Sequence, residues 1–150
     1  MANTYTRLLH HCIWSTKDRS PLISQEIETR LWSYLAGIAK HNNIHPIRIG
    51  GIDNHIHALL DLPKTLTIPD AMKLLKGNSS AWINDEKLTS THFQWQDGYA
   101  AFSVSPSNVT AVSAYIANQR EHHRHQTFEE EYKTLLQRHG IEFHELYTFG

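Results

Sequence analysis

Four stretches of the chain have the pattern of apolar and polar residues that is typical of β-strands. They cover residues 5–14, 44–52, 55–62 and 99–104, and polar or glycine-containing turns bound them. Only two residues separate the second stretch from the third, which is short enough for an antiparallel hairpin. The pattern therefore predicts four strands, two of them joined by a tight turn.

Other segments repeat apolar residues at the three- and four-residue spacing of amphipathic helices. Each of them begins or ends at residues that commonly cap helices, such as Ser, Thr, Pro and Gly. The predicted helices are residues 24–41 with Ser24 as N-cap, a segment that begins at Pro69 and loosens at 77–80, a segment that follows Ser105 and Pro106 and contains Tyr115, and a segment from a capping box at 127–130 to about Gly140.

The order strand, helix, strand, strand, helix, strand, and then further helices is that of a ferredoxin-like α+β sandwich. In this fold an antiparallel sheet has helices on one face, and here an additional C-terminal helix follows. We expect the other face of the sheet to be left free to meet a substrate. Because no internal repeat, low-complexity tract or linker divides residues 1–150, we predict a single domain.

The third predicted strand carries two histidines, His55 and His57, whose side chains should leave the same face of the sheet. Tyr115 and Gln119 stand four residues apart in a predicted helix and should also share a face. Two imidazoles, a phenol and an amide are the parts of a metal-assisted phosphoryl-transfer site. Taken singly, each has a plainer interpretation, because histidine pairs are common in strands and a helical tyrosine often packs in the core.

Charge limits how this chain can meet a nucleic acid. Its 14 Lys and Arg residues are balanced by 15 Asp and Glu residues, a net charge of -1, whereas many nucleic-acid binders are basic overall. Any contact with DNA must therefore be local. Residues 120–125 contain arginines and histidines that could supply it, although cations at the end of a helix also simply offset the helix dipole.

The cellular compartment is indicated by features that the sequence lacks. The single cysteine, Cys12, excludes an internal disulfide and is expected to pack in the core. Residues 1–6 do not resemble a signal peptide, and no apolar segment is long enough to span a bilayer. We therefore expect a soluble cytoplasmic protein.

Several motifs, taken together and in order, resemble those of a known family. His55-Ile56-His57 is a His-apolar-His triplet, the feature that gives the HUH superfamily of single-strand DNA endonucleases its name. The chain is similar to the single-tyrosine transposases of small insertion sequences, the insertion-sequence-200-like transposases, from Tyr5 to about Tyr147. The other motifs are HCIWSTKDR at 11–19, LLKGNSS at 74–80, WQDGY at 95–99 and YIANQREHH at 115–123.

This resemblance implies roles for particular residues. Tyr115 would be the nucleophile, and His55, His57 and Gln119 would hold a divalent metal, Mg²⁺ or Mn²⁺. The implied partner is single-stranded DNA with hairpin ends, and family members are typically homodimers whose active sites are shared between subunits. The resemblance also implies a bacterial or archaeal cytoplasmic protein.

The implied chemistry depends on activating a phenol, whose ordinary pKa is near 10. The oxygen of Tyr115 would attack phosphorus, release a 3′-hydroxyl and leave a 5′-phosphotyrosine. A later 3′-hydroxyl could reverse this reaction and rejoin strands without ATP. Trp14, Trp95 and Tyr99 are candidates for stacking DNA bases, although each is also a candidate for ordinary core packing.

Two other functions compete with this one. Histidine-triad nucleotide hydrolases also carry alternating strand histidines, but they need a third histidine at the position that Leu59 occupies here. A catalytically silent DNA-binding regulator could keep the transposase fold without the chemistry. The intact set of His55, His57 and Tyr115 favours an active transposase over this alternative.

Overall fold

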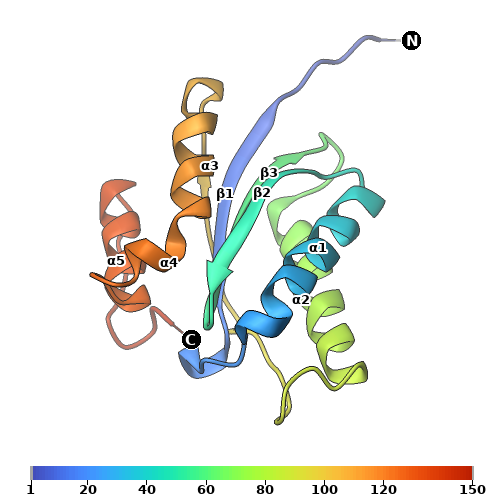
Figure 1. Cartoon of the computed structure of the whole chain (residues 1–150). Coiled ribbons are helices and arrows are strands. Elements are labelled where there is room, and N and C mark those ends of the chain that lie inside the picture. The colour runs from blue at the N-terminus through green and yellow to red at the C-terminus, as the bar shows by residue number, and fades with distance from the viewer. Residues whose placement is uncertain (1, 150) are drawn as a thin grey trace.

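The computed structural model describes residues 2–149 and has at its centre a four-stranded antiparallel sheet (Figure 1). The strands lie in the order β2-β3-β1-β4. The elements are the strands β1 (Leu8–Ser15), β2 (His45–Ile52), β3 (His55–Leu62) and β4 (Ala100–Ser103), the helices α1 (Gln25–His41), α2 (Ile68–Asp85), α3 (Val109–Ala117), α4 (Gln119–His122) and α5 (Phe128–Arg138), and the short 3-10 helices η1 (Lys17–Arg19) and η2 (Pro106–Asn108).

The succession β1-α1-β2-β3-α2-β4 and the strand order confirm the predicted ferredoxin-like α+β fold. Ser24 precedes α1, as predicted, and the capping box between Thr127 and Glu130 begins α5. Within residues 2–149, no helix combines the length and the apolar character that a membrane span requires.

One face of the sheet packs against α1 and α2. The even-numbered residues of β3, among them Ile56 and Leu60, enter this core together with Leu31 of α1 and Leu75 of α2. Cys12 of β1 is also fully buried there, as expected. Because side chains alternate along a strand, this packing sends His55 and His57 to the opposite face.

The aromatic residues proposed to stack DNA bases belong to this same core. Trp14 is fully buried, and Trp95 packs edge-on against it with its indole Nε1 donating to Ser79 Oγ at 2.9 Å. Tyr99 is half-buried against the same cluster. Of the two interpretations, core packing is therefore the one that holds for Trp14 and Trp95, whose rings fill the interior.

The second face of the sheet is covered by α3, α4 and α5 of the same chain, on the side away from α1 and α2 (Figure 1). Phe128 and Tyr132 of α5 pack with Ile13 of β1 and Phe102 of β4 in a second apolar cluster. The expectation of a free sheet face is therefore wrong. The apolar side of α5 needs a surface to cover, and this face of β1 and β4 provides it.

Helix α2 does not loosen at residues 77–80 but continues to Asp85. Its polar residues bond back to the helix that they were expected to end, because Asn78 Nδ2 donates to Leu74 O at 2.9 Å and Ser79 Oγ donates to Lys76 O at 3.2 Å. Gly77 has open space around it and tolerates the helical conformation.

Lys76 of α2 fixes the turn that leads into β4. Its ammonium group donates to three backbone carbonyls, at 2.7 Å to Gln96 O, 3.2 Å to Asp97 O and 2.8 Å to Gly98 O. Three carbonyl oxygens around one ammonium satisfy all of its donors. The contact ties the LLKGNSS segment to the WQDGY segment and so connects two of the motifs found in the sequence.

Replacing Lys76 with Met should therefore lower the free energy of unfolding by about 1–3 kcal/mol, because three carbonyls lose a charged donor. Urea denaturation followed by circular dichroism measures this change. Lys73→Met, an exposed change one turn earlier on α2, is the control and should stay within about 0.5 kcal/mol of the parent. Equal stability of the two variants would show that the Lys76 contacts contribute nothing net.

Candidate active site

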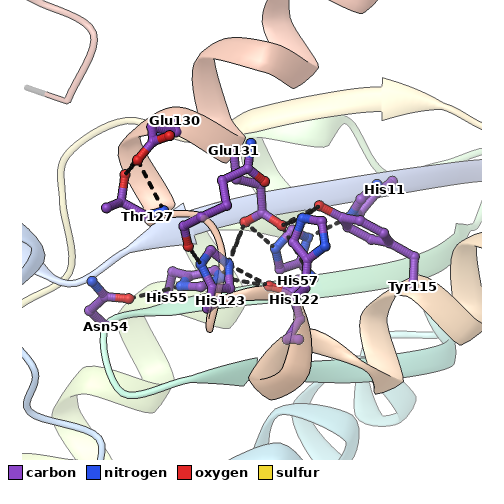
Figure 2. A network of polar contacts seen from close by, with 12 residues as sticks. His11, Asn54, His55, His57, Tyr115, His122, His123, Thr127, Glu130 and Glu131 are labelled. Atoms are coloured by element: carbon purple, nitrogen blue, oxygen red, sulfur yellow. Dashed lines mark hydrogen bonds and ion pairs between the residues drawn. The ribbon is translucent and has the colours of Figure 1, made fainter.

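His55 and His57 lie in the interior between β3 and the helices α3 to α5, and both side chains are fully buried. Their Nε2 atoms point toward the carboxylate of Glu131 in α5 (Figure 2). Glu131 Oε1 lies 3.1 Å from His57 Nε2 and 3.4 Å from His55 Nε2. The strand alternation thus delivers the two imidazoles to one point, as the sequence predicted.

The other nitrogen of each imidazole is held by a neighbour. His55 Nδ1 lies 2.8 Å from Asn54 Oδ1, and His57 Nδ1 lies 2.7 Å from Nε2 of His11 in β1. Burial lowers the pKa of His55 to about 4, and burial together with the nearby His57 lowers the pKa of His11 to about 3. His55 and His11 are therefore neutral at neutral pH, each with one N–H and one lone pair.

The hydrogen bonds around His55 indicate where its lone pair points. Asn54 Oδ1 can only accept, so His55 Nδ1 carries the proton and Nε2 carries the lone pair. That lone pair faces Gln119 Oε1 at 2.8 Å, while Gln119 Nε2 donates to Glu131 Oε2 at 3.1 Å. Two acceptors at this separation repel each other unless a cation lies between them. The geometry therefore offers a place that suits a cation.

Glu131 is the residue that sequence reasoning missed. Its side chain is 1% exposed, and its Oε1 also lies 3.0 Å from His123 Nε2. Burial alone would raise its pKa, but the surrounding imidazoles of His123, His55 and His57 lower the pKa far below its ordinary value, so the group is a carboxylate. A sequence signal existed, because Glu131 lies between Phe128 and Tyr132 on the apolar face of α5, where a charged residue is unexpected.

His123 completes the ring of imidazoles around this carboxylate. Its Nδ1 donates to the backbone oxygen of Gln126 at 2.7 Å, and its Nε2 lies 3.0 Å from both Gln119 Oε1 and Glu131 Oε1. Burial opposes its charged form, but the hydrogen bond to Glu131 and the charge of that residue raise its pKa above the ordinary value. The carboxylate of Glu131 thus favours the charged form of His123.

Tyr115 joins the same centre from α3. Its hydroxyl donates to Glu131 Oε2 and lies 3.3 Å from His122 Nε2. Burial first, and then the negative charge of Glu131, raise the pKa of the phenol above its usual value. The tyrosine and the histidine pair are therefore brought together within one chain, and the carboxylate of Glu131 connects them.

Tyr115 and Gln119 reach the centre from two helices rather than from one. Helix α3 ends at Ala117, Asn118 leaves the helical conformation, and α4 begins at Gln119. The prediction of one continuous helix is wrong, but both side chains still face the histidines. Gly50 of β2 permits this arrangement, because a Cβ there would come within 2.9 Å of the backbone oxygen of Ile116 in α3.

The basic cluster at residues 120–125 is divided between structural and site roles. Arg120 donates to both carboxylate oxygens of Glu28 in α1, and Arg124 pairs with Glu121 one turn earlier. His122 and His123 instead turn toward Glu131. The two arginines thus already have acidic partners within the protein.

The residues of this centre form a donor set that suits a divalent metal. One ligand atom each from His55, His57 and Glu131 lie within 4.8 Å of one another, and Gln119 Oε1 is next to them. Two imidazoles, a carboxylate and an amide oxygen are ligands found around divalent first-row metals. The buried lone pairs that face one another at His55 and Gln119 independently call for a positive charge.

The sequence of this chain is similar to those of known transposases. A family model described as "Transposase IS200 like" matches residues 4–119. The ISDra2 transposase TnpA of Deinococcus radiodurans is 29% identical over 121 residues, which cover 77% of this chain and 86% of that protein. The transposase for insertion sequence element IS200 of Salmonella typhimurium is 25% identical over 127 residues, covering 81% of this chain and 82% of that protein.

Solved structures that are similar to this chain are also those of transposases. A putative transposase from Deinococcus radiodurans R1 superposes with a TM-score of 0.63 at 26% identity, over 79% of this chain and 95% of that one. A REP-associated tyrosine transposase bound to a REP hairpin superposes with a TM-score of 0.59 over 82% of this chain and 73% of that one; at 12% identity it shows the shared fold alone. Because the family model spans most of the sequence, including His55, His57, Tyr115 and Gln119, the chain belongs to the IS200-like transposase family.

Proposed function

We propose that this transposase cuts and rejoins single-stranded DNA through a covalent bond to Tyr115, with the help of a divalent metal. One observation carries the proposal: the hydroxyl of Tyr115 and the Nε2 atoms of the two strand histidines meet at the buried carboxylate of Glu131. A phenol beside a metal-binding donor set is the arrangement that nucleophilic attack on a phosphodiester needs.

In the proposed reaction, the oxygen of Tyr115 forms a bond to phosphorus, and the bond from phosphorus to the 3′ oxygen breaks. Glu131 Oε2, which already accepts a hydrogen bond from the phenol, takes its proton. The leaving 3′ oxygen takes up a proton and becomes a hydroxyl, while the DNA stays on Tyr115 as a 5′-phosphotyrosine. Attack by a 3′-hydroxyl on this ester is the reverse step and joins two strands without ATP.

We assign the metal to His55, His57 and Glu131, with the amide oxygen of Gln119 as a further ligand. When bound, a divalent metal supplies positive charge that offsets the carboxylate beside the phenol and polarises the phosphate oxygens. The two oxygens of Glu131 have different roles in this proposal. Oε1 faces the histidines and is the metal ligand, and Oε2 faces Tyr115. The oxygen ligands favour Mg²⁺ or Mn²⁺ over softer metals.

The position of α5 bears on how DNA reaches this centre. His55, His57, Gln119 and Glu131 are at most 1% exposed. A scissile phosphate therefore reaches them only when the helices that cover this face move, whereas the half-buried Tyr115 already lines an open pocket. The hairpin bound by one structural relative supports a DNA partner with a hairpin, and the homodimer with shared active sites stays a prediction from the family.

Replacing Tyr115 with Phe should abolish a covalent protein–DNA adduct, with a loss of more than about 10³-fold, because no other group takes over the nucleophile. The assay is a labelled single-stranded hairpin oligonucleotide with Mn²⁺, resolved on a denaturing gel. Tyr34→Phe, a change on α1, is the control and should form the adduct normally. An adduct that persists in Tyr115→Phe rejects this nucleophile, and DNA binding without any parental adduct favours the silent regulator.

His57→Ala and Glu131→Gln should each weaken Mn²⁺ binding by at least about tenfold, because each removes a ligand or its charge. Electron paramagnetic resonance of free Mn²⁺ during titration measures this affinity without DNA. His92→Ala, which changes an exposed histidine, is the matched control and should bind Mn²⁺ as the parent does. Unchanged affinity in both site variants would contradict the metal assignment.

His11 is expected to act on the metal through His57. If His57 Nε2 is a ligand, its Nδ1 must donate to His11 Nε2, which lies 2.7 Å away. Loss of such an outer partner typically costs 10–100-fold in metal affinity, so His11→Phe should weaken Mn²⁺ binding by about this factor. His11→Gln, which retains an acceptor, should recover part of the affinity. Equal affinity of His11→Phe and the parent would show that His11 only fills space.

A further inference from the structure

A pocket of about 380 Å³ opens between β4, α3 and α5, and the side chains of Tyr115 and His11 form part of its wall. Its rim is accessible, since Asn108, Ala111 and His139 are all exposed. The buried centre around Glu131 thus has an open pocket as its neighbour, with the nucleophile belonging to both. The metal-assisted chemistry proposed above does not use this pocket.

The walls of the pocket suit a flat ligand with polar edges. Phe102, Val112 and Leu135 supply apolar surface, and Ser103 and Asn108 supply polar groups. Apolar walls with a few placed polar groups are typical of small-ligand sites of this size.

One wall of the pocket carries a fixed aromatic surface. His139 stacks on Phe102 with ring centroids 4.0 Å apart and an interplanar angle of 13°. Its Nδ1 donates to the backbone oxygen of Leu135 at 2.8 Å, so the imidazole is held in this orientation. Stacking on histidine and other aromatic rings is a usual way for proteins to hold an unpaired base.

A positive charge at the rim of the pocket indicates that the ligand carries a negatively charged group. Arg138 lines the pocket and is exposed. Tyr115 lines the same pocket, so the guanidinium and the proposed nucleophile face one space. A guanidinium there is well placed for a phosphate, because Arg binds phosphate oxygens bidentately.

We propose that this pocket receives one unpaired nucleobase, that of the nucleotide next to the phosphate that Tyr115 attacks, with Arg138 contacting the adjoining backbone. This inference rests on the proposed function, since it takes DNA as the substrate of Tyr115. Seating a base here fixes the register of the strand, so that one particular phosphodiester lies at the phenol oxygen. The pocket would then contribute to the choice of cleavage site.

The test is a titration of the full-length protein, labelled with ¹³C at Val and Leu methyl groups, with each of the four 2′-deoxynucleoside 5′-monophosphates. We expect saturable shifts of the Val112 and Leu135 methyl signals, and none with 2-deoxyribose 5-phosphate, which has no base. His139→Ala should weaken this binding by at least about fivefold, the lower end of what one stacked base contributes.

A matched pair of variants on α3 separates pocket binding from surface binding. Ala111→Phe places a ring in the pocket and should abolish the saturable shifts, whereas Ala114→Phe, an exposed change one turn later, should leave them intact. Equal shifts with 2-deoxyribose 5-phosphate, or unchanged binding in Ala111→Phe, would overturn the proposal.

The adduct assay distinguishes failure of this proposal from failure of the proposed function. A parent protein that forms the Tyr115 adduct but shows no base-dependent methyl shifts overturns the base pocket alone. If base-dependent shifts appear but no adduct forms with Mg²⁺ or with Mn²⁺, the strand-cutting function is contradicted. The pocket is then supported as a nucleotide site.

Discussion

The burial of the Glu131 carboxylate is the constraint on which this site depends. A carboxylate removed from water is strongly destabilising unless charges and hydrogen bonds compensate it. Here His55, His57 and His123 surround one oxygen, and Gln119 and Tyr115 donate to the other. One buried charge thus holds a strand, two short helices and a C-terminal helix in a single arrangement. It also brings Tyr115, the proposed nucleophile, beside the proposed metal ligands.

The fold makes this arrangement possible by giving the sheet two different faces. The apolar residues of β3 pack against α1 and α2, and this packing fixes the register in which the histidines point the other way. Helix α5 then closes the second face with Phe128 and Tyr132 and carries Glu131 between them. The apolar side of this helix supplies packing energy, while its one buried acid places a carboxylate in the site. The helix that covers the site therefore also belongs to it.

Local rules were enough to predict the strands, the hairpin, the capping box and the convergence of His55 with His57, because each depends on residues near in sequence. The end of α2 was mispredicted, since Asn78 and Ser79 bond back to their own helix and tertiary packing extends it. Glu131 was missed because its role depends on contacts with β3 and α3, which are distant in sequence. It also lies beyond residues 4–119, where the family model matches. Trp14 was open to two interpretations, and only its burial decided for the core.

Anomalous diffraction from crystals soaked in Mn²⁺ would test the central claim most directly, because it locates the cation without relying on activity. The account predicts an anomalous peak between the Nε2 atoms of His55 and His57 and the carboxylate of Glu131, with the hydroxyl of Tyr115 beside that carboxylate. Absence of a peak there at saturating Mn²⁺, or a peak with the Tyr115 hydroxyl remote from it in every chain, would contradict the account.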